Sequence, residues 1–342
     1  MLLRMPGYCE KFRCIADKCR DSCCIGWEID IDRGTAAYYE SVGGEFGEIL
    51  RENIADGCFV LNKDERCPFL NERGLCDIII RLGEDKLCQI CSDHPRYFEW
   101  FGSVKEGGIG LCCEEAARLI LSEEHSLSER EVPDEECDEY DVQLFELLFK
   151  ARELIVSHIQ HDRLPEAVSA MLDFAEQLQF NIDNGEYELP VWEQSTRPQQ
   201  PDIAAVFGCF SELEPISPDW LPYLSERLGT AKKTAPLSAE NELYLRRIAV
   251  YFIYRYFLKG TFDGEIVSRV KLAAVSVWLI GCLWEYERLS IGSCGFEQRS
   301  LIAKNYSKEV EYSEENLEVL ADMFYERECF STSRIKGLFQ IK

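Results

Sequence analysis

The sequence predicts a mainly α-helical protein in two unlike parts: an irregular, cysteine-rich N-terminal domain with short strands, followed by a helical bundle. Two observations lead to this prediction. Twelve of the seventeen cysteines fall at or before Cys113, among many glycines and turn signals. From Val142 onward, apolar residues recur at three- and four-residue steps, as on one face of a helix. We therefore expect a first domain at 1–121, a linker at 122–141 and a helical domain at 142–342.

Length and charge narrow the class of protein. A chain of 342 residues with 46% hydrophobic content has room for two folded domains and is not disordered overall. The formal net charge of -25 argues against nucleic acid as a partner, because phosphates require a basic surface. The same charge argues against anionic membranes and favours a basic or lysine-presenting partner.

The N-terminal residues and the longest uncharged run predict the cellular compartment. The first eight residues, Met1 to Tyr8, contain no apolar segment typical of a signal peptide. The longest uncharged run, Leu272–Trp284, has thirteen residues, fewer than a membrane-spanning helix needs. We therefore expect a cytoplasmic protein. Thiols stay reduced there, so the cysteines indicate metal binding rather than disulfides.

Three features define the N-terminal part. Residues 27–32 alternate apolar and acidic side chains, as in a short half-buried strand. A helix is expected at Glu114–Leu121, directly after Cys112 and Cys113. In Ser122–Asp141, ten of twenty residues are acidic, which is typical of a solvated linker.

Helices dominate the rest of the chain. The first is expected from Val142 to about His158, and Pro165 fits the first turn of a second that ends near Phe180. Three prolines make Leu189–Pro201 a loop. Two apolar helices at Ala239–Leu258 and Gly264–Arg288 are expected at the centre of the bundle, and Ser313 is expected to cap a last short helix.

The cysteine spacing indicates a metal site. Cys14, Cys19, Cys23 and Cys24 place four thiols in eleven residues, far more than packing needs. A zinc site commonly takes two C-x2-C pairs, and the first half of the chain has one, Cys88 and Cys91. Dense, irregular thiols with an adjacent pair favour an iron–sulfur cluster, with zinc as the alternative.

These residues carry a resemblance to the flagellin lysine-N-methylase family, within a wider group of cysteine-rich, zinc- or iron-chelating domains. The similarity covers nearly the whole chain, and we expect its specific part to be the early cysteines rather than the helices. Its motifs are Cys14-x4-Cys19-x3-Cys23-Cys24-x-Gly26-Trp27, Cys67-Pro68-Phe69-Leu70, Leu75-Cys76, Cys91-x2-His94-Pro95-Arg96, Cys113-x2-Ala116-Ala117-Arg118-Leu119 and Tyr306-Ser307-Lys308-Glu309-Val310-Glu311.

The resemblance implies a lysine N-methyltransferase that acts on flagellin, with S-adenosylmethionine as methyl donor and a [4Fe-4S] cluster. Cys9, Cys58, Cys88 and Cys112 lie outside the shared pattern. Tyr312 departs from it where a histidine is expected, and Glu114 where a proline is expected. The thiols that the resemblance implies as metal ligands are Cys14, Cys19, Cys23, Cys24, Cys67, Cys76, Cys91 and Cys113.

Catalytic and donor-binding residues are not assigned by the sequence. Gly107-Gly108-Ile109-Gly110 lacks the spacing of a nucleotide-binding loop. Tyr244, Tyr251 and Tyr254 share a helix face that could attract an ammonium group, but such stripes usually pack in a core, and we favour that interpretation. His94 and Arg96 are likewise interpreted as structural before functional.

Two other functions compete with the enzyme. A metal-held scaffold, with zinc or iron, would use the same thiols only to hold its fold while the helices bind a partner. A thiol redox protein is the weaker alternative, because its usual mark is a solitary C-x2-C beside a strand–helix unit. Binding of S-adenosylmethionine distinguishes the enzyme from the scaffold.

Overall fold

The most apolar segment of the chain forms the central helix of the fold. The structure is a computed structural model that describes residues 1–26, 28–137, 139–231 and 238–340. Helix α12 (Val267–Ile291) is long and apolar enough by composition to cross a membrane, although the uncharged run alone is shorter. Its most apolar window is 94% buried inside the protein, as in the core helix of a folded domain.

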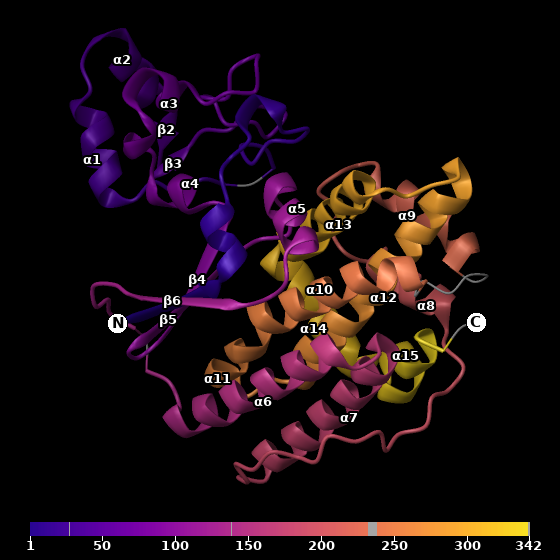
Figure 1. Cartoon of the computed structure of the whole chain (residues 1–342). Coiled ribbons are helices and arrows are strands. Elements are labelled where there is room, and N and C mark those ends of the chain that lie inside the picture. The colour runs from indigo at the N-terminus through magenta and orange to yellow at the C-terminus, as the bar shows by residue number, and fades with distance from the viewer. Residues whose placement is uncertain (27, 138, 232–237, 341–342) are drawn as a thin grey trace.

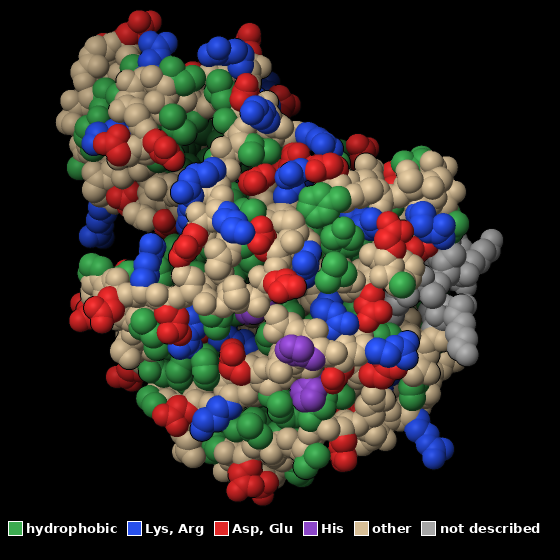
Figure 2. Space-filling view, in the orientation of Figure 1, with side chains coloured by type: hydrophobic (Ala, Val, Ile, Leu, Met, Phe, Trp, Pro, Cys, Tyr) green, Lys and Arg blue, Asp and Glu red, His purple; other side chains and the backbone are tan. Residues whose placement is uncertain are grey.

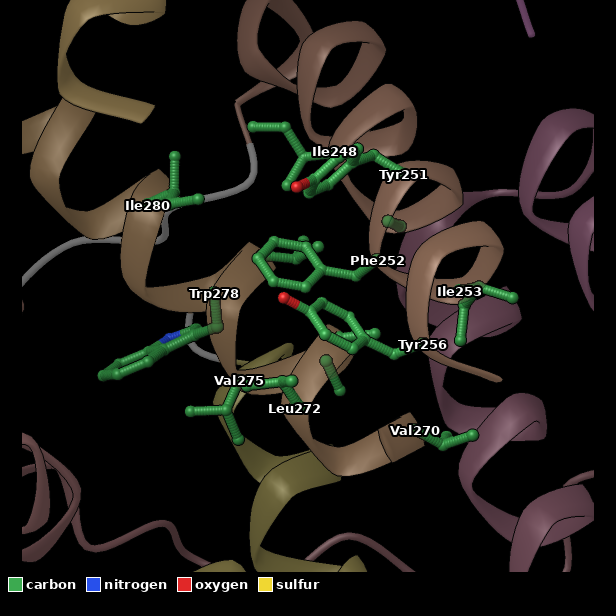
Figure 3. Close-up of a cluster of buried hydrophobic side chains, with 14 of the residues drawn as sticks. Ile248, Tyr251, Phe252, Ile253, Tyr256, Val270, Leu272, Val275, Trp278 and Ile280 are labelled. Atoms are coloured by element: carbon green, nitrogen blue, oxygen red, sulfur yellow. The ribbon is translucent and has the colours of Figure 1, made fainter. Parts of the chain in front are cut away.

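Helix α10 (Ala239–Tyr256) packs along α12. Phe252 and Tyr256 of α10 reach toward the segment of α12 that carries Leu272 and Val275 (Figure 3). Trp278 of α12 is fully buried in the same cluster. Burial of large apolar side chains at this contact supplies the main stabilisation of the helical part.

The other helices surround this pair (Figure 1). Four of them match the expected segments, at 114–122, 142–161, 164–183 and 314–326: Pro165 lies in the first turn of α7, and the Ser313 side chain caps α14. Two helices between residues 203 and 231, and those at 260–263, 296–311 and 332–338, were not expected. The surrounding elements, in which η denotes a short 3-10 helix, are α5 (Glu114–Ser122), α6 (Val142–His161), α7 (Leu164–Asp183), α8 (Ile203–Phe210), α9 (Trp220–Ala231), η4 (Phe257–Lys259), α11 (Gly260–Asp263), α13 (Phe296–Glu311), α14 (Glu314–Glu326), η5 (Glu328–Phe330) and α15 (Thr332–Leu338).

A four-stranded sheet lies beside the helices, in the order β4-β5-β1-β6. The N-terminal strand is central: it pairs in parallel with β5 from Leu2 opposite Val104, and antiparallel with β6. The strands are β1 (Leu2–Pro6), β4 (Arg96–Phe101), β5 (Val104–Ile109) and β6 (Leu127–Glu131).

The acidic stretch differs from the expected linker. Its residues Leu127–Glu131 form β6, and Glu135 accepts hydrogen bonds from Lys105 (2.8 Å) and from the Trp100 ring nitrogen (2.8 Å). Glu129, Arg130 and Glu131 are all exposed, because this strand is at the edge of the sheet, so its charged side chains stay in solvent while the backbone pairs with β1. Charge density alone therefore gave the wrong structure for this segment.

Residues 29–91 form a separate lobe with a hydrophobic core of its own, around Tyr39, Phe59 and Phe69. Ile29 and Ile31 are buried between exposed acidic neighbours, as the alternation predicted, but only Asp30 makes an isolated bridge and no strand forms in the described part of 27–32; Trp27 lies outside the described residues. The elements of residues 7–93 are η1 (Gly7–Lys11), η2 (Ala16–Lys18), α1 (Arg33–Ser41), α2 (Gly44–Glu52), β2 (Ile54–Ala55), β3 (Cys58–Phe59), α3 (Asp77–Leu82), η3 (Glu84–Lys86) and α4 (Gln89–Asp93).

The two cores divide the chain at places that the cysteine count did not indicate. Tyr8, Phe12 and Phe101 belong to the large core of the helices, together with Leu111 and α5. The lobe is thus an insertion between β1 and β4, not the first third of the chain. The cysteine-rich first third of the chain is divided between the two cores, because the sheet strands on either side of the lobe pack on the helices.

A buried ion pair joins the sheet to the helices. Arg152 of α6, with no exposed surface, donates two hydrogen bonds to Glu106 of β5 at 2.5 and 2.7 Å. Arg4 of β1 lies 3.5 Å from the same carboxylate. Such a pair holds the geometry of the elements that it connects, because loss of one partner leaves an uncompensated buried charge.

We predict that Glu106→Gln lowers the free energy of unfolding by about 3 kcal/mol, since Arg152 loses its charged partner inside the protein. Denaturant-induced unfolding monitored by circular dichroism measures the change. Arg163→Gln is the matched control, because its ion pair with Glu166 is on the surface with 77% of the Arg163 side chain exposed. The control should change stability by less than about 1 kcal/mol. Equal effects would contradict the assigned role of the buried pair.

Candidate functional site

Short helices position several of the predicted ligand cysteines. Cys76 directly precedes α3, and Cys113 directly precedes α5. Burial raises the pKa of the Cys113 thiol to about 12, and backbone N–H groups of the first turn of α5 partly oppose that rise. A metal ion would offset the cost of a buried thiolate at such a position.

Electrostatic interactions link thiols from four separate segments. Cys67 interacts with Cys76, Cys88 and Cys23, and Cys91 interacts with Cys88, Cys24 and Cys67. A backbone hydrogen bond of 2.8 Å from Cys67 to Cys24 holds two of these segments together. We call this set the thiol group: Cys23, Cys24, Cys67, Cys76, Cys88 and Cys91.

The remaining predicted ligands lie on the side of α5. Cys113 interacts with Cys19 and Cys23, and the Cys19 sulfur lies 3.8 Å from Glu114. Cys14 is exposed, and its sulfur accepts a hydrogen bond of 3.4 Å from the backbone of Ala16. The fold thus gathers seven of the eight predicted cysteines around Cys23 and Cys67, and leaves Cys14 at the surface.

Cys88 belongs with these thiols, although the sequence pattern left it out. It is fully buried, and its neighbour Cys91 lowers the pKa of the Cys88 thiol. In turn, Cys88 raises the pKa of Cys91. One thiolate is favoured at this pair, which is the state in which sulfur binds metal.

The other cysteines outside the pattern lie elsewhere. Cys9 is buried in the large core, and Cys112 lines a cavity described below. The Cys58 sulfur lies 3.1 Å from both Glu28 and Asp30, whose carboxylates raise its pKa to about 12. Cys209 and Cys329 are buried in the large core, with sulfurs 3.9 Å apart.

The spacing of the thiols tests which metal group they fit. In a zinc site with Zn–S bonds near 2.3 Å, tetrahedral geometry places the sulfurs about 3.8 Å apart. Among the described residues, the one group of three ligand atoms within 4.8 Å of one another is Glu28, Asp30 and Cys58. Within the described residues, therefore, no three of the thiols lie at the spacing of a preformed zinc site.

Ion pairs hold the loop of Cys19–Cys24 against α13. Asp21 pairs with Lys304 and, at 2.9 Å, with Lys308. Burial acts to raise the pKa of Asp21, but the hydrogen bonds from the two lysines outweigh it and lower the pKa to about 2. Arg20 makes a similar link, since its backbone donates to Glu114 at 2.8 Å. These ion pairs and hydrogen bonds therefore hold the loop of Cys19–Cys24 against helices α13 and α5.

A cavity of about 650 Å³ opens between the lobe, the sheet and the helices. Cys112, adjacent to the predicted ligand Cys113, is part of its wall, so the cavity lies beside the thiols. Figure 2 shows that acidic side chains are spread over one face of the protein, with Lys and Arg among them. The cavity is lined by Asp30, Ile31, Asp32, Gln89, Ile90, Asp93, His94, Pro95, Arg96, Tyr97, Phe98, Trp100, Gly110, Cys112, Arg255, Glu311, Tyr312 and Glu314.

Glu311 at the end of α13 is the buried carboxylate of this cavity. Its Oε2 accepts hydrogen bonds from the hydroxyls of Tyr251 (2.9 Å) and Tyr256 (2.8 Å) and lies 3.5 Å from Arg255. Arg255 also donates to the Tyr251 hydroxyl at 2.6 Å and lies over the ring of Tyr97. Burial, the largest effect, raises the pKa of Tyr251 and Tyr256 well above 10 and keeps both as hydrogen-bond donors.

The tyrosine stripe that the sequence suggested is mostly core. Tyr254 is buried and donates to the backbone of Arg4 at 3.2 Å, and Tyr244 packs against Trp284. Tyr251 alone of the three reaches a group of the cavity wall, Glu311. The core interpretation is therefore confirmed for Tyr244 and Tyr254.

The two residues near Cys91 that the sequence singled out, His94 and Arg96, both lie in the cavity wall, as does Tyr312. Burial and the nearby Arg255 lower the pKa of His94 to about 4, so its ring is neutral at pH 7. Tyr312, which replaces an expected histidine, meets His94 edge to face with ring centres 6.2 Å apart. Burial and the thiols Cys112, Cys23 and Cys24 raise the pKa of Tyr312. Tyr312 thus connects the thiol group to the cavity.

Sequence reasoning missed Glu311 and Arg255. Glu311 falls inside one of the segments that carry the resemblance, but no spacing rule marks a single glutamate as buried. Arg255 is one of several arginines in a helix of mixed composition. Their pairing across α10 and α13 arises from tertiary packing.

Comparison with known proteins identifies the family. The FliB lysine N-methylase C-terminal domain matches residues 152–338, more than half of the chain. The chain belongs to the FliB lysine N-methylase family. The matched region contains α10, α12 and α13, and with them Arg255 and Glu311. It contains none of the predicted ligand cysteines, so our expectation that the helices would identify nothing was wrong.

Individual relatives match a shorter stretch. A lysine-N-methylase of Salmonella typhimurium is 27% identical over 136 residues, 36% of this chain and 33% of that protein. A lysine-N-methylase of Salmonella choleraesuis gives the same values. The flagellar biosynthetic protein FliU of Salmonella muenchen is 27% identical over 137 residues, which is 79% of its length. The match thus spans about a third of the two methylases. No solved structure matches.

Glycine in β5 makes room for the aromatic wall of the cavity. A Cβ at Gly108 would lie 2.3 Å from the hydroxyl of Tyr97 on the paired strand β4, and one at Gly107 would lie 2.7 Å from the Phe98 ring. The glycines that resembled part of a nucleotide loop therefore serve the sheet. They allow two rings of the cavity wall to lie flat across β5.

We predict that Gly108→Ala destabilises the protein by about 1–3 kcal/mol, because the methyl group forces Tyr97 out of its position. Gly208→Ala is the control: no atom lies within 4 Å of its added Cβ, and it sits in helix α8. The control should stabilise the protein by about 0.5–1 kcal/mol. Thermal or denaturant unfolding of both variants measures the difference, and a neutral Gly108→Ala would show that the Tyr97 ring is not held there.

Proposed function

We propose that this protein is a lysine N-methyltransferase that modifies flagellin in the cytoplasm, with S-adenosylmethionine as methyl donor. The observation that carries the proposal is a cavity, lined by carboxylates and aromatic rings, directly beside the thiol group in a member of the FliB lysine N-methylase family. The donor supplies an activated methyl group when bound. The names of the flagellar relatives support the choice of flagellin.

Lysine methylation requires a deprotonated acceptor amine. An unperturbed lysine has a pKa of about 10.4, so at pH 7 roughly one in a few thousand amines is neutral and able to accept a methyl group. A buried site favours the neutral amine by desolvation, and a carboxylate can accept the proton. Glu311 offers such a carboxylate inside the protein, held by Tyr251 and Tyr256.

The thiols are proposed to hold a [4Fe-4S] cluster. The thiols come from the loop of Cys19–Cys24, from Cys67 and Cys76, from α4 and from the start of α5, and a polynuclear cluster takes its ligands from several loops. Held by these thiols, such a cluster would supply a Lewis-acidic site for the amino and carboxylate groups of the donor. The residues proposed to hold it come from the eight predicted cysteines, together with Cys88.

The scaffold alternative has one observation in its favour. The ion pairs of Asp21 with Lys304 and Lys308 tie the thiol loop to α13, as they would if the metal only joined the lobe to the helices. Such a protein would bind metal but not S-adenosylmethionine. Donor binding by calorimetry on anaerobically purified protein separates the two, and its absence would favour the scaffold.

We predict that the anaerobically purified protein contains iron and acid-labile sulfide, and that Cys23→Ser and Cys88→Ser each lose much of the iron. A serine oxygen is a poor substitute for a soft thiolate, and both sulfurs lie within the thiol group. Iron and zinc per chain are measured by elemental analysis. Cys58→Ser is the matched control, because Cys58 contacts Glu28 and Asp30 instead of the thiol group. Protein that carries stoichiometric zinc and no sulfide would refute the cluster.

Methyl transfer is the direct test of the proposed activity. The wild-type protein should transfer labelled methyl groups from S-adenosylmethionine to lysines of purified flagellin, as detected by mass spectrometry. Cys58→Ser should retain the activity and Cys23→Ser should lose it. Wild-type protein with full iron content that leaves flagellin unmodified would disprove the proposal for this substrate.

A further inference from the structure

We propose that the cavity beside the thiol group binds the side chain of the acceptor lysine, with Oε1 of Glu311 accepting a hydrogen bond from its terminal nitrogen. This inference rests on the proposed function and assigns the acceptor site within it. The observations that support it are an unpaired buried oxygen, the charge of the cavity lining and its aromatic walls.

The first observation is the state of Glu311. Its side chain has no exposed surface, and its Oε1 has no hydrogen-bond partner among the described residues, while Oε2 accepts two hydrogen bonds from tyrosines. A buried carboxylate oxygen without a donor is costly, and most such groups in folded proteins are paired. A ligand that donates an N–H group to this oxygen would remove that cost.

The second observation is the charge of the lining. Five carboxylates and two guanidinium groups line the cavity, which leaves a formal charge of minus three with His94 neutral. Arg255 offsets part of the charge of Glu311, to which it is paired at 3.5 Å. The other acidic residues, Asp30, Asp32 and Asp93 on the lobe and Glu314 on α14, attract a cation from solvent.

Both cosubstrates carry a net positive charge, since the sulfonium and ammonium groups of S-adenosylmethionine outweigh its carboxylate. The acidic lining therefore attracts either of them, and the assignment to lysine rests on the unpaired Oε1 of Glu311 and on the aromatic walls. The binding experiments below separate the two occupants.

The third observation is the shape of the walls. Tyr97, Phe98 and Trp100 of β4 and Tyr312 after α13 present rings to the cavity. Such rings pack on the methylenes of a lysine and attract its ammonium group through cation–π interactions. The volume of about 650 Å³ lies within the range of about 300–1,000 Å³ that is typical of small-ligand sites.

Equilibrium binding of two peptides to the full-length protein tests the inference. The probes are a short blocked peptide with one lysine and the same peptide with norleucine, which keeps the alkyl chain and lacks the nitrogen. Wild type should prefer the lysine peptide. In Glu311→Gln the affinity for that peptide should fall about tenfold or more, as expected for loss of a charged hydrogen bond. Affinity for S-adenosylmethionine, measured separately, should not change.

A second pair of variants keeps the test valid if Glu311→Gln fails to fold. Glu314 is exposed in the first turn of α14 and lines the cavity, whereas Glu315 is exposed in the same turn and is not among the described lining residues. Glu314→Lys should weaken binding of the lysine peptide about fivefold by charge repulsion, and Glu315→Lys should have a much smaller effect. The same charge change on one helix turn thus isolates the cavity.

The outcomes separate this inference from the proposed function. If wild type methylates flagellin but does not distinguish lysine from norleucine, or if Glu311→Gln and Glu314→Lys both keep wild-type affinity, the acceptor site is wrong and the enzyme stands. If Glu311→Gln loses donor affinity instead, the cavity binds the donor and the inference is overturned. Loss of lysine-peptide affinity in the variants supports the site even if flagellin is not the substrate.

Discussion

The contact between α10 and α12 is the interaction on which the other parts of this structure depend. One face of α10 carries Phe252 and Tyr256 into the core against α12 (Figure 3). Next to that face, Tyr251 and Arg255 reach the cavity carboxylate Glu311. Because the apolar contact holds α10 rigidly, it also places the polar groups of the candidate site. A site built on packed helices keeps its geometry better than one built on loops.

Charged residues then connect the sheet and the thiol loop to the helices. Arg152 and Glu106 join α6 to β5, and Asp21 joins the thiol loop to Lys304 of α13. These links tie the sheet and the thiol loop to the helices and so form the surroundings of the cavity. The cysteine-rich lobe therefore belongs to the site together with the helices, because residues of both line the same cavity.

In the proposed enzyme, the thiols and the cavity carboxylate come from different parts of the chain. The thiols gather where the lobe meets α5, and the cavity opens beside them, with Cys112 and Tyr312 in its wall. The family match falls on the helical part that carries Glu311. Both halves are needed for the proposed reaction: one to hold a metal group, the other to present a carboxylate to an amine.

The sequence by itself determined the parts of the protein that depend on local pattern. The helices α6, α7, α10, α12 and α14 follow from apolar spacing and capping residues, whereas the metal site that the thiol density indicates stays a prediction. Only the tertiary structure decided that Leu127–Glu131 is a strand and that Glu311 is buried beside Tyr251 and Arg255. The physical reason is that each of these depends on contacts between segments far apart in the chain, and local residue spacing carries no record of such contacts.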